Sequence, residues 1–348
     1  MLTNSTTSER PTLTIAIPTF NRASFLSHTL ERIQAQRSAI GNDKVELLVC
    51  DNHSDDSTPD VLRAVQALDL SVRVIRHDTN IGPDHNIATC FMRARGRYVW
   101  ILGDDDFPVD GLLMYLIPIL EKADYGLVYL KPYGYDADPI AERPLSRGGE
   151  REYTNLADFL YRVGAHLTFI SSILVCKDCV EKRDYLTHES NNLLQLEIYL
   201  AAAKRSSKYL YISRYSVSCK RNNSGGYDFT EVFVNRLSAA IDRHLRQHIP
   251  EAARALRNAV LLRYYPQNVL LMRLRRDKKT QSNYLQFRKA FKTNAIFWVV
   301  VAPIFNLPRW PAIAWGGAWM LLGRSLGGNL TNGIQFAYHR LRRALYAQ

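Results

Sequence analysis

Short apolar runs alternate with amphipathic segments over the first hundred residues of the chain. The runs are rich in Val, Ile and Leu, which is typical of buried β-strands, and the segments between them repeat apolar residues at helical spacing. This alternation predicts an α/β domain with a mostly parallel sheet that carries helices on its faces. The expected strands cover residues 12–17, 45–50, 72–75 and 98–102, and the expected helices cover 23–37, 59–68 and 83–95.

Polar residues are concentrated where the expected strands end, either directly after a strand or in the loop that follows it. In open parallel sheets, ligands bind in the crevice beyond the carboxyl ends of the strands. The chain therefore gathers its candidate chemistry at one edge of the sheet. The segments concerned are 18–22, 51–58, 80–86 and 104–106.

Three consecutive acids, Asp104, Asp105 and Asp106, end the strand at 98–102 after Gly103. Adjacent carboxylates repel one another, so this arrangement favours a bound cation that neutralises them. Ligands that are all oxygen suit a hard divalent ion such as Mg²⁺ or Mn²⁺. The alternative is an acidic turn that caps a helix starting near Asp110, because aspartates also favour helix N-termini.

Four motifs in order resemble family 2 of the glycosyltransferases: IPTFNR at 17–22, CDNHSDD at 50–56, NIGPDHN at 80–86 and GRY…GDDD at 96–106. The third motif is similar to the abequosyltransferase-type branch, which builds bacterial O-antigen and other surface polysaccharides. The resemblance implies the GT-A fold, which binds a nucleotide-sugar donor. It is strong over residues 12–130 and weaker over 130–220.

The resemblance also assigns roles to residues at the sheet edge. Asp106 would ligate the metal, Asp104 the metal or the donor ribose, and Asp51 the nucleobase or ribose. Four of the other positions have a structural alternative: Phe20 as core filling, Arg22 as the partner of an acid, Asp84 as a helix cap and Asp105 as a solvated turn residue. The expected donor-binding residues are Pro18, Thr19, Phe20, Arg22, Asp51, Asp84, Asn86, Asp104 and Asp105, and the expected metal ligands are Asp104 and Asp106.

A catalytic base must take the proton from the acceptor hydroxyl. In inverting members of the family it belongs to an acidic motif about 80–100 residues beyond the metal-binding acids. That part of the chain lacks the usual Glu-Asp pair. Glu189 is the first candidate and Glu197 the second, although both could be ordinary helix charges.

The C-terminal third is strongly basic. The chain of 348 residues has a net charge of +12, but residues 236–348 hold 19 Lys and Arg against 3 Asp and Glu. Two apolar runs, 295–305 and 312–323, carry Trp residues and are interrupted at 306–311. Each run is too short to span a bilayer of about 30 Å as one straight helix. A helix at the lipid–water interface is favoured; a spanning segment or a self-packing helical domain are the alternatives.

These observations predict an enzyme that transfers a sugar from a nucleotide-sugar donor to a saccharide acceptor, with Mg²⁺ or Mn²⁺ as cofactor. A polyprenyl-linked acceptor is implied by the resemblance alone. The alternatives are a metal-dependent nucleotidyl- or phosphotransferase, and a non-catalytic GT-A domain with a basic nucleic-acid surface. We expect an anionic membrane surface as a partner and no nucleic acid. Residues 1–10 lack the apolar core of a signal peptide, so we expect a cytoplasmic location, on the inner face of the cell membrane. The expected organisation is a flexible N-terminus over 1–11, a GT-A domain over 12–228 and a basic helical, membrane-associating region over 229–348.

Overall fold

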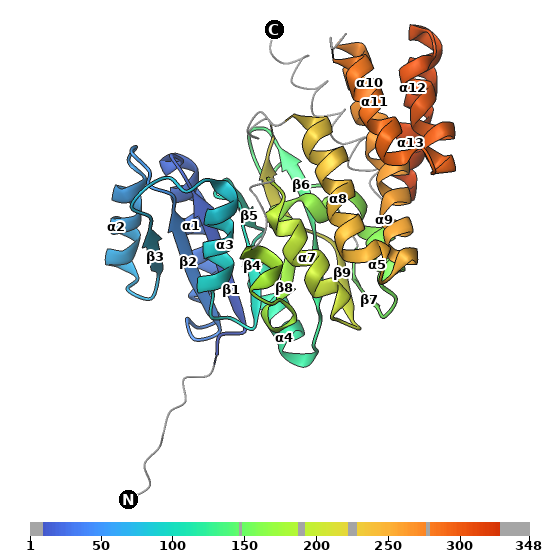
Figure 1. Ribbon diagram of the computed structural model, residues 1–348. Coiled ribbons are helices and arrows are strands. Elements are labelled where there is room, and N and C mark those ends of the chain that lie inside the picture. The colour runs from blue at the N-terminus through green and yellow to red at the C-terminus, as the bar shows by residue number, and fades with distance from the viewer. Residues whose placement is uncertain (1–9, 146–147, 187–191, 222–227, 276–278, 328–348) are drawn as a thin grey trace, which may run out of the picture.

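The fold is known from a computed structural model that describes residues 10–145, 148–186, 192–221, 228–275 and 279–327. A mixed sheet runs through the molecule, with helices on both of its faces, and the C-terminal helices gather beside its β7–β9 end (Figure 1). Residues 1–9 of the predicted flexible N-terminus lie outside the described ranges, and so does Glu189.

The N-terminal half of the sheet is wholly parallel, as the sequence pattern predicted. Strands β2 and β4 flank β1, and β3 forms the outer edge beyond β2. Almost every side chain of β1, β2 and β4 is buried, as expected for strands covered by helices on both faces. The four strands are β1 (Leu13–Thr19), β2 (Val45–Asp51), β3 (Arg73–Arg76) and β4 (Tyr98–Ile101).

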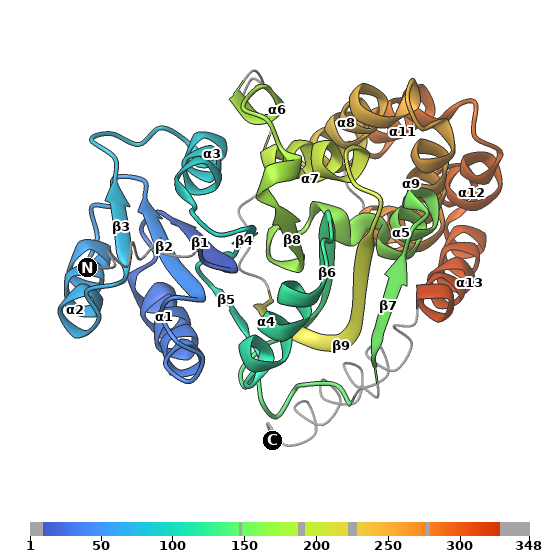
Figure 2. The same ribbon diagram turned by 90° about the horizontal axis from the view of Figure 1, so that it is seen from below.

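The second half of the sheet mixes directions. Strand β8 lies antiparallel between β4 and β6, and β9 runs parallel to β6. Strands β5 and β7 both pair antiparallel with β9, which is long and strongly curved (Figure 2). These strands are β5 (Asp106–Pro108), β6 (Leu127–Tyr135), β7 (Glu150–Tyr153), β8 (Ile173–Cys176) and β9 (Tyr209–Lys220).

Two hydrophobic clusters fill the two sides of the sheet. Helices α1 and α4 pack on one side, with α2 beside α1, and α3, α5 and α7 pack on the other (Figure 2). The helices of the sheet region are α1 (Ala23–Arg37), α2 (Thr58–Leu68), α3 (Pro83–Arg93), α4 (Leu112–Lys122), α5 (Leu156–Val163), α6 (Arg183–Leu186) and α7 (Leu194–Lys204). Three short 3-10 segments accompany them: η1 (Gly164–Thr168), η2 (Ile170–Ser172) and η3 (Lys177–Cys179).

The C-terminal helices share the hydrophobic cluster that contains α5 and α7, so they form a continuation of the core on that side. No helix among the described residues is long and apolar enough to cross a membrane. The interruption predicted at 306–311 is shorter in the structure, where only Leu307 and Pro308 separate the last two described helices. The elements are η4 (Glu231–Arg236), α8 (Leu237–Ile241), η5 (Asp242–Arg246), α9 (Pro250–Arg263), α10 (Tyr265–Leu274), α11 (Thr280–Phe291), η6 (Phe297–Val301), α12 (Ala302–Asn306) and α13 (Arg309–Gly327), where η4, η5 and η6 are π-helical.

Candidate functional site

The ends of β1, β2 and β4 bring two of the predicted acids together around Thr19. Thr19 lies opposite Asp51 in the parallel β1–β2 pair. The Thr19 hydroxyl also donates a hydrogen bond of 2.8 Å to Asp104 Oδ2, just beyond β4. Helix α1 fixes the same turn, because the Thr29 hydroxyl donates to the Asp104 carbonyl at 3.0 Å. Asp51 and Asp104 therefore lie on either side of one threonine at the carboxyl edge of the sheet.

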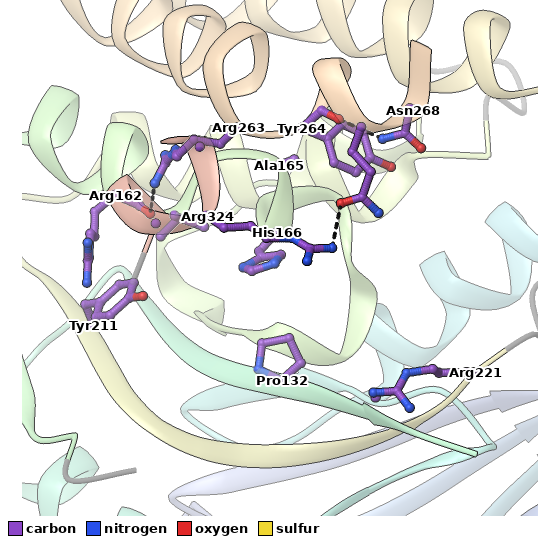
Figure 3. Close-up of a pocket in the computed structure, with 15 residues that line it drawn as sticks. Pro132, Arg162, Ala165, His166, Tyr211, Arg221, Arg263, Tyr264, Asn268 and Arg324 are labelled. Carbon is purple, nitrogen blue, oxygen red and sulfur yellow. Dashed lines mark hydrogen bonds between the residues drawn. The ribbon is translucent and has the colours of Figure 1, made fainter. Parts of the chain in front are cut away.

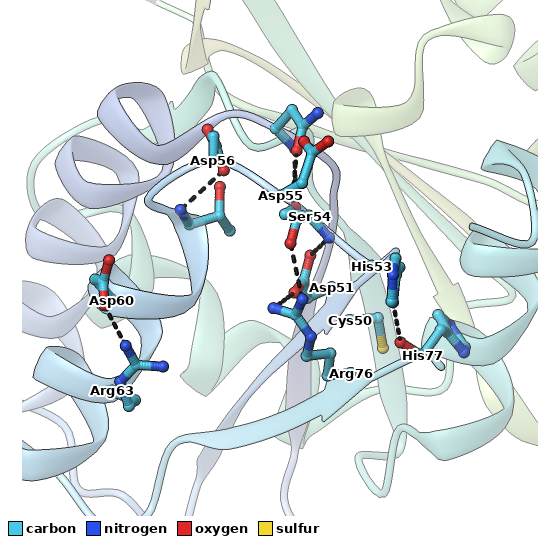
Figure 4. A network of polar contacts seen from close by, with 12 residues as sticks. Cys50, Asp51, His53, Ser54, Asp55, Asp56, Asp60, Arg63, Arg76 and His77 are labelled. Carbon is cyan, nitrogen blue, oxygen red and sulfur yellow. Dashed lines mark hydrogen bonds and ion pairs between the residues drawn. The ribbon is translucent and has the colours of Figure 1, made fainter. Parts of the chain in front are cut away.

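Asp51 is fully buried and is held by a polar network (Figure 4). Its Oδ1 accepts from the Ser54 backbone at 3.0 Å, and its Oδ2 lies 3.0 Å from Arg76 Nη1. Arg76 also donates to the Ser54 carbonyl at 2.8 Å. Arg76 was not predicted as part of the site, although a cation directly after the expected strand at 72–75, which neighbours the strand of Asp51, could have indicated the pair.

Asp105 and Asp106 lie over Gly103, where the missing side chain leaves space. A Cβ at this position would lie 3.1 Å from Asp106 Oδ2 and 3.3 Å from Asp105 Oδ1. Ser171 closes the space from the side, since its hydroxyl donates to Asp106 Oδ2 at 2.5 Å and accepts from the Gly103 backbone at 2.9 Å. Asp106 is buried at the start of β5, opposite Cys219 of β9.

Burial and the charges of neighbouring acids make the carboxyl groups of Asp104 and Asp106 harder to ionise. Burial raises the pKa of Asp104 to about 6, and the charge of Asp105 acts in the same direction while the hydrogen bond from Thr19 opposes it. Burial also raises the pKa of Asp106 well above its ordinary range, again helped by Asp105. A cation placed among the three carboxylates would stabilise their ionised forms.

A cavity of about 510 Å³ opens beside Asp105, between α1 and the end of β6. Arg32, His28 and Lys220 line it together with Asp105 and a second acid, Asp138, so three basic and two acidic side chains face the same space. Two predicted donor contacts lie nearby: the Phe20 ring is 41% exposed, and Arg22 Nη1 lies 3.9 Å from Asp105 Oδ2. The size suits a small anionic ligand.

Two residues of the third predicted motif, Asp84 and Asn86, are buried. Asn86 donates to the Cys50 carbonyl at 2.9 Å and lies 3.1 Å from His77, so it joins α3 to the end of β2. Asp84, in the first turn of α3, accepts a hydrogen bond of 2.7 Å from the Asn192 backbone. Asn192, three residues after Glu189 in the sequence, is thereby attached to the same edge of the sheet.

Glu197 lies apart from this constellation, inside the packing of α7 against η5. The side chain is 1% exposed, with one oxygen bound by Arg243 and the other 2.6 Å from His244 Nε2. These bonds lower the pKa of Glu197 against the effect of burial, which raises it. An acceptor hydroxyl has no access to such a carboxylate, so the structure gives Glu197 a role in stability.

Replacing Glu197 with Gln should therefore destabilise the protein by about 2–4 kcal/mol at pH 7, because it removes the buried carboxylate that binds the buried His244 and the half-exposed Arg243. Since the folded pKa is depressed, this contribution is present above the unfolded pKa and is lost as the pH falls through the folded value. Urea unfolding at pH 7 and at a series of pH values from 5 down to 3 measures both effects. Glu231→Gln, which removes an exposed pair with Arg236, should cost less than about 1 kcal/mol. Equal losses for the two variants would contradict the structural role.

The residues at Gly103 fit a divalent cation that is shared with a substrate. No three His, Cys, Asp or Glu side chains of the described ranges are arranged as a complete metal cage. Mg²⁺ is commonly held by one or two carboxylates together with substrate phosphates. Asp105 and Asp106, whose oxygens face the space over Gly103, supply such a partial set.

The comparison with protein families decides the assignment of this region, because a model of "Glycosyl transferase family 2" matches residues 14–181. Residues 14–181 belong to this family. The family 2 region contains β1 to β4, the Asp51 network and the three consecutive acids. It ends before the C-terminal helices.

Among curated proteins, this chain is similar to the GalNAc(5)-diNAcBac-PP-undecaprenol β-1,3-glucosyltransferase of Campylobacter jejuni. The two are 30% identical over 121 residues, which cover 34% of this chain and 37% of that protein. The matches cover between 24% and 39% of the length of the curated relatives.

Solved structures share the architecture over most of the chain. Staphylococcus aureus TarS 1–349, in complex with UDP-GlcNAc, superposes with a TM-score of 0.63 at 14% identity and covers 92% of both chains. The mannosyltransferase PcManGT from Pyrobaculum calidifontis, in complex with GDP-Man and Mn²⁺, gives 0.53 at 18% identity, with 95% of this chain and 87% of that one covered. Together with the family match, these likenesses confirm the predicted GT-A α/β fold.

Proposed function

We propose that this protein transfers a sugar from a nucleotide-sugar donor to a saccharide acceptor that is linked to a lipid, in the synthesis of a surface polysaccharide. The observation that carries the proposal is the gathering of Asp51, Thr19 and Asp104 beside Asp105 and Asp106, at the carboxyl edge of a family 2 domain. The named activity of the Campylobacter relative and its undecaprenol-linked substrate support the choice of acceptor.

In this proposal the donor lies across the strand ends. Asp51 accepts hydrogen bonds from the base or ribose and is kept in place by Arg76 and Ser54. Asp104, which faces Thr19, contacts the ribose side of the donor. Asp106 and Asp105 hold the divalent cation over Gly103. A cation bound there would neutralise the diphosphate that leaves when the sugar is transferred.

The acceptor hydroxyl needs a base, and we propose Glu189. It lies outside the described residues, but the nearby Asn192 is bonded to Asp84 at the edge of the sheet where the donor would bind. The burial of Glu197 against Arg243 and His244 supports the choice of Glu189 over Glu197.

The C-terminal region is proposed to rest on the anionic inner face of the cell membrane. Residues 236–348 are strongly basic, and Trp310 of α13 is 74% exposed, together with Trp298 and Trp315 at 43% and 38%. Exposed tryptophans with nearby cations are typical of helices at a lipid–water interface. We retain the division at residues 228 and 229, since β9 ends before it and helices follow.

A screen of UDP-, GDP-, CDP- and dTDP-sugars with Mn²⁺ tests the donor class. Ligand at about 100 times its Kd stabilises a protein by about 2.7 kcal/mol, so the right donor should raise Tm by about 4 °C or more. The same nucleotide sugars with EDTA, and the free sugars with Mn²⁺, are the controls. If no nucleotide sugar raises Tm above these controls, the protein does not bind such donors and the proposal fails.

A further inference from the structure

A second cavity of about 510 Å³ lies where the sheet meets the C-terminal helices. Its walls come from β6 and β9, from α5 and η1, and from α9, α10 and α13. Four arginines line it, Arg162, Arg221, Arg263 and Arg324, and none of the described residues in the lining is Asp or Glu. Figure 3 shows these side chains around the ring of His166.

Three of the arginines keep their charge available to a ligand. Among the ion pairs of the described residues, none joins Arg162, Arg263 or Arg324 to a carboxylate; they bond instead to backbone carbonyls, to a Gln amide and to aromatic rings. The buried Nε of Arg263 has no hydrogen-bond partner in the structure. Arg221 differs, because it pairs with Asp136 and Glu142.

Close backbone packing holds these cations together. Arg263 lies over Gly164, where a Cβ would be 2.7 Å from its Nη2, and Gly323 lets α13 approach the Leu262 carbonyl of α9. Arg324 therefore faces the same space as Arg263. Burial lowers the pKa of Arg263, and the charge of Arg162 also lowers it. His166 is neutral at physiological pH, because burial lowers its pKa to about 4, with Arg263 acting in the same direction. Holding like charges this close costs the folded protein free energy, and this is typical of sites that bind an anion.

The pocket lies on the same face of the sheet as Asp106. Gly134 of the pocket lies opposite Cys219 in the β6–β9 pair, and Cys219 lies opposite Asp106 in the β9–β5 pair. Residues directly opposite on neighbouring strands point to the same face. Two strand spacings of about 4.8 Å separate the backbones of Gly134 and Asp106, a distance of about 10 Å. Arg221 packs over Gly134, between the two sites.

The outer surface of α13 beside the pocket is apolar. Leu322 and Leu326, which flank the lining residues Gly323, Arg324 and Gly327, are 46% and 48% exposed. Helix α13 contains no acidic residue. An arginine pocket bordered by exposed leucines matches a ligand with a phosphorylated head and a hydrocarbon tail.

We propose that this pocket binds the diphosphate of the lipid-linked acceptor, with the lipid chain against α13 and the saccharide directed toward Asp106. The assignment of the lipid as acceptor rests on the proposed function. The binding of a diphosphate does not, since it can be measured without any transfer.

Calorimetry on the full chain in EDTA, which removes any divalent cation from the acid site, tests the pocket with inorganic pyrophosphate and with geranyl diphosphate. Arg324→Gln should weaken both ligands about tenfold, the loss expected for one charged hydrogen bond. Arg309→Gln, an exposed arginine on the same helix, is the matched control and should bind as the wild type does. Leu326→Ser should weaken geranyl diphosphate several-fold and leave pyrophosphate unchanged.

Wild-type affinity for both ligands in Arg324→Gln would overturn the site, as would an equal loss in Arg309→Gln. Equal affinities for the two ligands, with no effect of Leu326→Ser, would overturn the lipid assignment and indicate a free anion. If geranyl diphosphate binds as predicted while no nucleotide sugar stabilises the protein, the pocket stands and the proposed function fails. Thermal melts of each variant verify that it folds, and Arg324→Lys, which keeps the charge, should retain more affinity than Arg324→Gln.

Discussion

Asp106→Asn should lower the rate of sugar transfer by about 10³-fold or more, which corresponds to about 4 kcal/mol of lost transition-state stabilisation. The variant loses the carboxylate that is proposed to hold the cation at the leaving diphosphate. The fold should remain intact, because burial and Asp105 already raise the pKa of the Asp106 carboxyl and make its ionised form costly. At pH 8 the metal-free variant should be at least as stable as the wild type.

Product formation at saturating donor, with Mn²⁺ present, measures the effect, and a thermal melt measures stability. Asp110→Asn is the matched control: Asp110 lies four residues away, its side chain is 70% exposed and its partner Arg32 lies 3.5 Å away. It should keep nearly full activity. Turnover by Asp106→Asn close to that of the wild type would remove Asp106 from the catalytic site.

Glu189→Gln should lower the transfer rate by about 10²–10⁴-fold, the range typical of losing a general base. Donor affinity should change little, because the base acts on the acceptor hydroxyl and leaves the nucleotide contacts intact. The residual rate should also lose the pH dependence that the ionisation of the base gives to the wild type. Initial rates across pH 5–9, together with donor binding by calorimetry, measure these effects.

Glu181→Gln is the control for Glu189, since Glu181 is an exposed acid eight residues earlier that pairs with Arg183. It should transfer sugar at nearly the wild-type rate. A Glu189→Gln variant that keeps its rate within a few-fold, with an unchanged pH profile, would mean that another residue takes the proton.

Local pattern was sufficient for the first half of the fold. The expected strand at 45–50 is β2 and the expected helix at 23–37 is α1, with the bounds within one residue, because apolar period and burial agree there. The pattern did not reveal that β8 lies antiparallel between β4 and β6. The pairing of β8 with β4 joins residues more than 70 positions apart, and a short apolar run such as 173–176 does not carry its own direction.

The polar sites also include some that the sequence pattern predicts and some that it does not. Asp51, Thr19 and Asp104 stand at strand ends, so the strand pattern alone predicted that they meet. The partners of Glu197 are 46 and 47 residues away on η5, and the arginines of the second pocket come from α5, α9 and α13 and from the end of β9. Such contacts depend on how helices pack, and in the sequence they are visible only as an excess of positive charge.

Calorimetric titration with UDP, GDP, CDP and dTDP, in Mn²⁺ and in EDTA, tests most directly whether the acids at the strand ends bind a cation and a nucleoside diphosphate together. In the wild type, at least one of the four nucleotides should bind about tenfold or more tightly with Mn²⁺ than with EDTA. A cation and a nucleotide that stabilise each other's binding typically change each other's affinity by about this factor. Asp106→Asn should abolish the gain. Binding that is as tight in EDTA as in Mn²⁺ for all four nucleotides, or a full gain in Asp106→Asn, would contradict a shared cation site at these carboxylates.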